Sequence, residues 1–147
     1  MHQGSMGDAQ TVNAGQVQIQ RDGQQGFSHN EINPNNDIQP MLQMWINPAP
    51  HAPAAQYHIQ DIQAGLNCVY GGDLFPAQTS VYTLHWPQGG EINITGEVLF
   101  YIVSGEAEIS ENGVKQALKR GNLVKGADMN IRAPGEMMGL LLSKSLL

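Results

Sequence analysis

This sequence has little charge of either sign and almost no cysteine. Only 14% of its 147 residues are charged, and Lys and Arg together number seven against thirteen Asp and Glu. So few cations cannot form the basic patch that binds phosphate backbones, so the composition argues against nucleic-acid binding and against a polybasic membrane contact. The single cysteine, Cys68, excludes an intramolecular disulfide and a Cys-rich zinc site.

Long apolar runs and a secretion signal are also missing from the sequence. No run approaches the ~20 apolar residues that a membrane-spanning helix needs, and no charged start followed by an apolar core marks export. We therefore expect a cytoplasmic protein. The opening segment 1–6 reads Met-His-Gln-Gly-Ser-Met. It is either the remnant of an expression tag, with a natural start at Met6, or part of the natural chain, and it is left out of the fold prediction.

The residues that are abundant point to short strands. Seventeen Gly and eight Pro divide the chain into segments rich in Val, Ile, Leu, Tyr and Thr, which is typical of a β-sandwich or barrel. Strict alternation predicts a strand over 16–20, and a second strand is expected over 41–46. A row of short strands is predicted over 80–143, with a tight hairpin turn at Asn112-Gly113, because both residue types tolerate positive φ.

A histidine and a glutamate lie two residues apart in the segment 26–31. On an extended strand the side chains alternate, so His29 and Glu31 are predicted to point to the same side. That spacing can bring an imidazole and a carboxylate onto one metal ion. Two ligands rarely hold a transition metal firmly, because three or four are the usual requirement. The alternative is a His–Glu hydrogen bond without a metal.

Several segments, in a coherent order, resemble a known family. The Gly-Phe-Ser-His-Asn-Glu of 26–31, the Gln-Met-Trp-Ile-Asn-Pro of 43–48 and the Gln-Tyr-His-Ile-Gln-Asp of 56–61 look like the middle of a pirin-family protein. The Gly-Glu-Ala-Glu-Ile of 105–109 and the Gly-Asn-Leu-Val of 121–124 resemble corners of a cupin barrel. Pirins are bicupins, with two cupin domains in one chain.

The resemblance covers roughly residues 8–147 and implies a fold. It implies an all-β protein with a cupin-type double-stranded β-helix, a jelly-roll barrel, and extra N-terminal strands. Segment 7–48 would hold strands that resemble the end of a first cupin, segment 49–60 would be a linker, and segment 61–147 would form a cupin barrel. The front of the first barrel has no counterpart in this chain.

The resemblance also implies half of a metal site. Pirin-like proteins bind iron or a similar divalent metal through three His and one Glu, and His29 and Glu31 match the third and fourth ligand positions. The first two ligands, in a His-x-His element, have no counterpart here. We therefore expect no cofactor. The alternative is iron or another divalent metal, with the missing ligands supplied by a partner chain.

In the second barrel, the positions at which cupins generally have metal ligands hold other residue types. Glu91 and Asn93 stand near the expected His-x-His, Glu97 near the expected Glu, and Arg132 near the last His. Arg has no lone pair to give to a metal, so this barrel is expected to be metal-free. The four residues are candidates for a ligand pocket. There Arg132 would pair with Glu91 or Glu97 inside the barrel, or would anchor a small acid.

These observations predict a non-catalytic, pirin-like cupin protein that acts by binding a small ligand or by protein assembly. Strands within 8–48 would lack their natural partners, and exposed strand edges favour pairing with a second copy. A homodimer is therefore predicted, with exchange of the N-terminal strands between subunits as one version of it. The alternative is a metal-dependent, quercetinase-like dioxygenase. It would open a flavonol with O2 at a metal whose ligands a partner chain completes.

Overall fold

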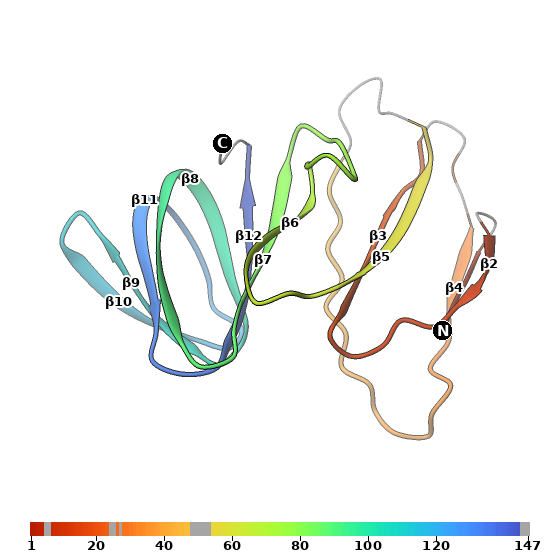
Figure 1. Cartoon of the computed structure of the whole chain (residues 1–147), viewed down its shortest axis with the longest axis horizontal. Coiled ribbons are helices and arrows are strands. Elements are labelled where there is room, and N and C mark those ends of the chain that lie inside the picture. The colour runs from red at the N-terminus through yellow and green to blue at the C-terminus, as the bar shows by residue number, and fades with distance from the viewer. Residues whose placement is uncertain (5–6, 24–25, 27, 48–53, 145–147) are drawn as a thin grey trace. The chain divides into compact units, whose positions relative to one another are not determined.

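The computed structural model describes residues 1–4, 7–23, 26, 28–47 and 54–144, without the side chains of residues 2, 3, 7 and 8. The chain divides into two compact units, Met1–Asp61 and Ile62–Leu147. All regular secondary structure in these ranges is β-strand (Figure 1), so the all-β class predicted from the sequence is confirmed. In the described part of the chain, no helix is long and apolar enough to cross a membrane.

Unit 1 holds two small antiparallel sheets. One has the strand order β2-β1-β4, and the other pairs β3 with β5. The strands are β1 (His2–Gly4), β2 (Gly7–Gln10), β3 (Gln16–Arg21), β4 (His29–Glu31) and β5 (Gln56–Asp61). The strand predicted over 16–20 is confirmed as β3. Strand β5 takes up the last part of the predicted linker 49–60, whose residues 49–53 lie outside the described residues. The predicted division into segments 7–48, 49–60 and 61–147 stays a prediction.

Leaving segment 1–6 out of the fold prediction was wrong for its first four residues. Strand β1 is the central strand of the three-stranded sheet. Next to it the N–H of Ile32 donates to the carbonyl oxygen of Met1 at 2.8 Å, and the terminal ammonium of Met1 donates to the carbonyl oxygen of Ile32 at 2.6 Å. Backbone donors and acceptors need partners, and those of β4 find them in a segment whose sequence gave no strand signal.

The strand expected over 41–46 is also wrong. Residues 32–47 contain no strand. Beyond Ile32, which bonds to Met1, the segment forms local hydrogen bonds: the Asn33 side chain donates to the carbonyl oxygen of Asp37 at 2.7 Å and accepts from the N–H of Asn35 at 3.0 Å, which is an Asx-type turn. Apolar side chains in the segment predict a strand only where a neighbouring strand receives its backbone groups, and among the described residues none pairs with it.

Unit 1 has almost no core. Ile19 and Arg21, both on β3, are its only buried residues among those described. Arg21 is held by hydrogen bonds, since Nε donates to the carbonyl oxygen of Ala54 at 3.1 Å and Nη2 donates to Oε1 of Gln56 at 2.9 Å. By contrast, Ile38 and Trp45 are 95% and 84% exposed. Hydrogen bonds therefore hold this unit together more than apolar burial does.

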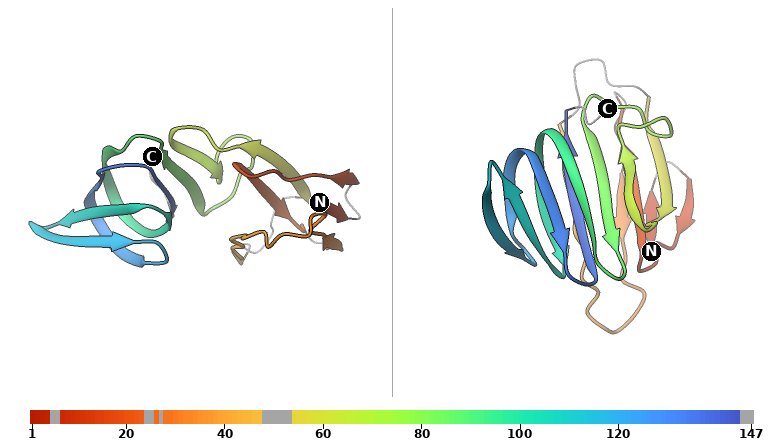
Figure 2. Two further views of the ribbon diagram at one scale, coloured as in Figure 1. Left: turned by 90° about the horizontal axis from the view of Figure 1, so that it is seen from below. Right: turned by 60° about the vertical axis from the view of Figure 1, so that its left-hand side comes forward.

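Unit 2 is one curved antiparallel sheet of seven strands, with the order β10-β9-β11-β8-β12-β7-β6 (Figure 2). Its strands are β6 (Gly65–Tyr70), β7 (Ser80–Trp86), β8 (Gly90–Ser104), β9 (Glu106–Glu111), β10 (Val114–Lys119), β11 (Leu123–Ala133) and β12 (Met137–Ser143). Strand β12 lies between β7 and β8, and β11 lies between β8 and β9. The sequence neighbours β8 and β9 are thus separated in the sheet.

The concave face of this sheet encloses one apolar core. Alternate residues of β8 and β11 point into it, as a strand with one buried face requires. The side chains of Phe100, Ile102, Ile131 and Leu141 are fully enclosed. The cluster consists of Tyr82, Leu84, Ile94, Val98, Phe100, Ile102, Ala107, Ile109, Leu118, Met129, Ile131, Ala133, Met137 and Leu141. Burial of this set is the main source of stability in unit 2.

The tight turn predicted at Asn112-Gly113 is confirmed. Both residues have positive φ, 50° and 78°, as a two-residue hairpin turn of the primed type requires. Glu111 and Val114 form the closing pair of the β9–β10 hairpin. This turn fixes the register of β9 against β10.

A β-bulge interrupts the pairing of β8 with β11. Thr95 and Gly96 of β8 face the single residue Asp128 of β11, because the register shifts between Ala127 and Met129. A bulge leaves ladder groups unpaired, and two carboxylates take them. Oδ1 of Asp128 accepts the N–H of Gly96 at 2.8 Å, and Oε1 of Glu111 accepts the N–H of Ala127 at 2.7 Å.

Replacing Glu111 with Ala is expected to destabilise unit 2 by roughly 1–3 kcal/mol, because the half-buried N–H of Ala127 loses a charged acceptor. Glu111→Gln keeps an acceptor oxygen and should cost less. Denaturant unfolding measures both. Glu108→Ala is the matched control: it removes the exposed pair with Lys115, 2.8 Å between Nζ and Oε1, and should cost less than ~1 kcal/mol. An equal cost for Glu111→Ala and Glu108→Ala would show that the bulge does not depend on Glu111.

Candidate functional site

The first candidate site lies on β4. The imidazole Nε2 of His29 and the carboxylate Oε1 of Glu31 are 4.0 Å apart, and their side chains are 21% and 32% exposed. Metal–nitrogen and metal–oxygen bonds of about 2.0–2.2 Å each allow one ion to touch both atoms when the atoms are at most ~4.2 Å apart. At the tetrahedral angle such bonds separate the two donors by only ~3.4 Å, so His29 and Glu31 would have to move closer together to share an ion, and the observed spacing matches a simple His–Glu contact.

Tyr57, on β5, belongs to the same neighbourhood. Burial raises the pKa of the Tyr57 phenol above its ordinary value, and the negative charge of Glu31 raises it further. This proximity could not be predicted from the sequence, because β4 and β5 are separated by more than twenty residues and pair with different strands. A phenol kept protonated beside a carboxylate is a hydrogen-bond donor to whatever occupies this place.

This site has few potential metal ligands. Among the side chains that the structure describes, no group of three or more His, Cys, Asp or Glu is placed to hold a metal ion. His29 and Glu31 thus form a pair of donors without a described third. Their role as metal ligands stays a prediction.

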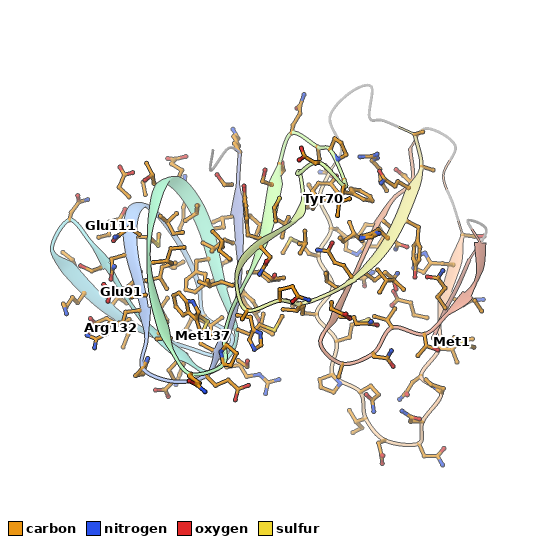
Figure 3. The ribbon with its side chains drawn as sticks, viewed as in Figure 1. Met1, Tyr70, Glu91, Glu111, Arg132 and Met137 are labelled. Atoms are coloured by element: carbon orange, nitrogen blue, oxygen red, sulfur yellow. The ribbon has the colours of Figure 1, made fainter. Side chains whose placement is uncertain are left out.

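The second candidate site, in unit 2, lies on the opposite face from that expected. Glu91, Asn93 and Glu97 on β8, and Arg132 on β11, are all exposed, whereas their strand neighbours Ile92, Ile94 and Ile131 belong to the core or pack against it. The expectation that Arg132 pairs with a glutamate inside the barrel is therefore wrong. Strand alternation turns these four residues outward and fills the interior with apolar groups. Glu91 and Arg132 are labelled in Figure 3. Whether they bind a ligand stays a prediction.

The outward face carries a polar network that sequence analysis missed. The side-chain amide of Asn130 donates to Oε1 of Glu91 at 2.9 Å and to Oδ1 of Asn93 at 3.0 Å. Nζ of Lys125 lies 3.8 Å from Oε1 of Glu97. The signal for Asn130 was present, since it is two residues from Arg132 and must share its face.

Arg132 stands between two acidic residues. In the sheet register it lies directly opposite Glu91 on β8 and directly opposite Glu108 on β9. Directly opposite residues carry neighbouring side chains on one face. The positive charge of Arg132 therefore has negative neighbours on both sides, which disfavours the capture of a free carboxylic acid at this point.

The single thiol is not set up as a nucleophile. Burial raises the pKa of Cys68 most, and the nearby carboxylate of Asp73 raises it further. Hydrogen bonding by the backbone of Tyr70 and by the side chain of Tyr82 acts in the opposite direction. The thiolate is the reactive form, so a raised pKa keeps Cys68 in its unreactive form near neutral pH.

Comparison with solved structures places the fold. The crystal structure of YhhW from Escherichia coli matches with a TM-score of 0.70 and 26% identity, over 96% of this chain and 65% of that chain. A nickel(II) complex of YhhW, described as a bacterial pirin, matches with a TM-score of 0.74 and 23% identity, over 96% of this chain and 66% of that one. This chain thus spans slightly less than two thirds of the length of YhhW.

More distant likenesses cover about half of the chain. A cupin superfamily protein from Desulfitobacterium hafniense matches with a TM-score of 0.45 and 17% identity, over 53% of this chain and 73% of that chain. At that TM-score the likeness adds nothing to the assignment. Neither a protein-family model nor a curated protein sequence matches the chain.

The fold agrees with the resemblance read from the sequence. Nearly the whole chain superimposes on a bacterial pirin, the described structure is all β, and unit 2 is a curved seven-stranded sheet closed over an apolar core. The cupin-type fold class predicted from the sequence is confirmed, and the chain resembles a bacterial pirin over nearly its whole length.

Proposed function

We propose that this pirin-like protein is non-catalytic and acts through assembly, as a homodimer formed by unit 1. The observation that carries the proposal is the state of segment 32–47. It contains no strand, and it exposes Ile32, Ile38, Met41, Leu42, Met44 and Trp45. Monomeric proteins rarely leave so many large apolar side chains in water over one short stretch, so such a surface marks an interaction site.

Charge supports a second copy as the partner. The chain has a net charge of −6, so two copies repel each other over most of their surfaces. Residues 38–47 include no Asp, Glu, Lys or Arg. Two acidic chains can meet at this segment without bringing like charges together, and apolar burial then provides the driving force.

The sheets of unit 1 support the same partner. Strand β2 and strand β4 are edges of a three-stranded sheet, and β3 and β5 each have one described neighbour. A two-stranded sheet alone is marginally stable in water, and an open edge is a template for pairing. Edge-to-edge pairing, or exchange of strands within 8–48, would complete these sheets and cover the apolar segment.

Binding of a small ligand by unit 2 has less support. The interior of the curved sheet is filled by large apolar side chains, and the outward group of Glu91, Asn93, Glu97 and Arg132 is exposed. A small-molecule site is usually concave and mostly apolar, with a few polar groups. We therefore favour protein assembly over small-ligand binding as the function of this protein.

The second candidate function is a metal-dependent dioxygenase of quercetinase type. Its support is the occurrence of His29 and Glu31 as neighbours on one strand and the likeness to YhhW, whose structure has been solved with nickel(II). A divalent metal held there would supply Lewis-acid and oxygen-activating chemistry. His29 and Glu31 would hold the metal, and the Tyr57 phenol would act as a hydrogen-bond donor beside it. In this version the remaining ligands come from a partner chain.

Light scattering after size exclusion is expected to give a mass of twice 16.0 kDa. Trp45→Glu places a charge in the uncharged apolar segment and should shift the mass toward that of one chain. Val114→Glu, at a residue of β10 that is also highly exposed, is the control and should leave the dimer intact. A wild-type protein that stays monomeric at every concentration would refute assembly through unit 1.

The two functions are separated by an oxygen-uptake assay with a flavonol as substrate. Protein incubated with Fe²⁺ or Ni²⁺ is expected to consume O2 no faster than protein kept in chelator, and Glu31→Gln should behave in the same way. Metal-dependent uptake that Glu31→Gln abolishes would establish the dioxygenase and overturn the non-catalytic assignment.

A further inference from the structure

Strand β8 changes its sequence pattern along its length. Residues 91–95 alternate between polar and apolar side chains, as in a strand with one face in water. Residues 98–103 read Val-Leu-Phe-Tyr-Ile-Val, without a polar residue. A continuous apolar run is typical of a strand that is covered on both faces. The core covers only one face of this run, because Phe100 is enclosed in it whereas Leu99, on the other face, is exposed.

The register of the sheet extends this second apolar face over three strands, β11, β8 and β12, which are neighbours in the sheet (Figure 2). Tyr101 lies directly opposite Leu123 of β11 and directly opposite Leu140 of β12. Leu99 lies directly opposite Leu142 of β12. Directly opposite residues carry neighbouring side chains on one face, so these five residues form one surface, here called the outer apolar patch. Leu123 and Leu99 are 61% and 38% exposed, and the other three are half-buried.

The charged groups beside the outer apolar patch neutralise each other. Lys125 on β11 lies directly opposite Leu99, and its Nζ is 3.8 Å from Oε1 of Glu97. The patch therefore offers neither an uncompensated cation to an acidic partner nor an uncompensated anion to a basic one. Electrostatic complementarity selects the partner at an interface, so this surface is suited to an uncharged, apolar partner segment.

Segment 38–47 of the same chain has that chemistry. It contains no charged residue, and its Ile38 and Trp45 are 95% and 84% exposed. Tryptophan is enriched among the side chains that provide most of the binding energy at protein interfaces, because it buries a large area at a low cost in side-chain entropy. The segment is therefore an apolar ligand without a described receiving surface, and the patch is an apolar surface without a described ligand.

We propose that the outer apolar patch of one copy receives segment 38–47 of a second copy, with Trp45 as the main contact. The inference rests on the homodimer proposed above and names the surface that receives the exposed segment. Unit 1 of one copy supplies the segment, and unit 2 of the other copy supplies the patch. Two copies related by a two-fold axis make this contact twice, because each carries one segment and one patch. Neither surface brings a net charge to the contact, although each chain has a net charge of −6.

Leu123→Glu tests the patch, because it places a carboxylate at the most exposed residue of that surface. Light scattering after size exclusion, over a concentration series, is expected to give a dimer dissociation constant at least about tenfold above that of the wild type. Val114→Glu is the matched control. It makes a similar change at an exposed apolar residue of β10, outside the patch, and should leave the constant unchanged. Circular dichroism of each variant checks that the fold persists.

Mixing Trp45→Glu with Leu123→Glu tests whether the two surfaces meet. Each variant alone has lost both contacts of the dimer. A mixed dimer keeps one, between the intact segment of the Leu123→Glu chain and the intact patch of the Trp45→Glu chain. The mixture is therefore expected to contain more dimer than either variant at the same total concentration. In a separate sample, photo-reactive p-benzoylphenylalanine in place of Trp45 should give a product of twice the chain mass, cross-linked at a peptide that contains Leu99 or Leu123.

The outcomes separate this inference from the homodimer on which it rests. A wild-type protein that is monomeric at every concentration would remove the homodimer and the patch contact together. A wild-type dimer that Trp45→Glu dissociates and Leu123→Glu does not would keep the homodimer and overturn the patch as its receiving surface. A mixture with no more dimer than the separate variants, or a cross-link to another part of the second chain, would also overturn it.

Discussion

Backbone hydrogen bonding between neighbouring strands is the constraint on which both units of this protein depend. A strand is stable only where an adjacent strand takes its N–H and C=O groups. In unit 2 the seven strands of one sheet form backbone hydrogen bonds with their neighbours. At the bulge between β8 and β11, the carboxylates of Glu111 and Asp128 accept the N–H groups of Ala127 and Gly96. In unit 1 the pairing is partial: β4 and Ile32 pair with the first residues of the chain, and residues 33–47 pair with no strand among the described residues.

The two units therefore present opposite chemistry. Unit 2 turns most of its apolar side chains inward and its polar ones outward, so the curved sheet forms a filled core and not a cup lined with donors. The residues at positions where the general cupin pattern has metal ligands face outward, where Asn130 donates to Glu91 and Asn93 and Lys125 lies near Glu97. Unit 1 has little core, exposes apolar side chains and carries the His29–Glu31 pair. Assembly is proposed for unit 1 because its strand edges are open and its apolar segment is exposed. Metal binding is the second candidate function because His29 and Glu31 are two potential ligands on one strand.

Several sequence-based predictions succeeded for a local reason. Period-two alternation over 16–20 and the Asn112-Gly113 turn depend on residues next to each other, so the sequence shows them directly. The pirin resemblance succeeded because its motifs occur in the right order. The strand expected over 41–46 failed because an apolar segment predicts a strand without showing whether a partner is present. The interior pairing of Arg132 failed because a motif position does not fix which face of the sheet a residue takes.

The sequence by itself determined the all-β class, the position of one tight turn and the pairing of His29 with Glu31 on one side of a strand. These features depend on residue type and spacing, which act over a few residues. Only the tertiary structure decided that residues 2–4 form the strand beside β4, that Tyr57 lies near Glu31, and that Asn130 joins Glu91 to Asn93. Each of these contacts joins residues about thirty or more positions apart or on different strands, and register between distant strands is set by the whole sheet and its core.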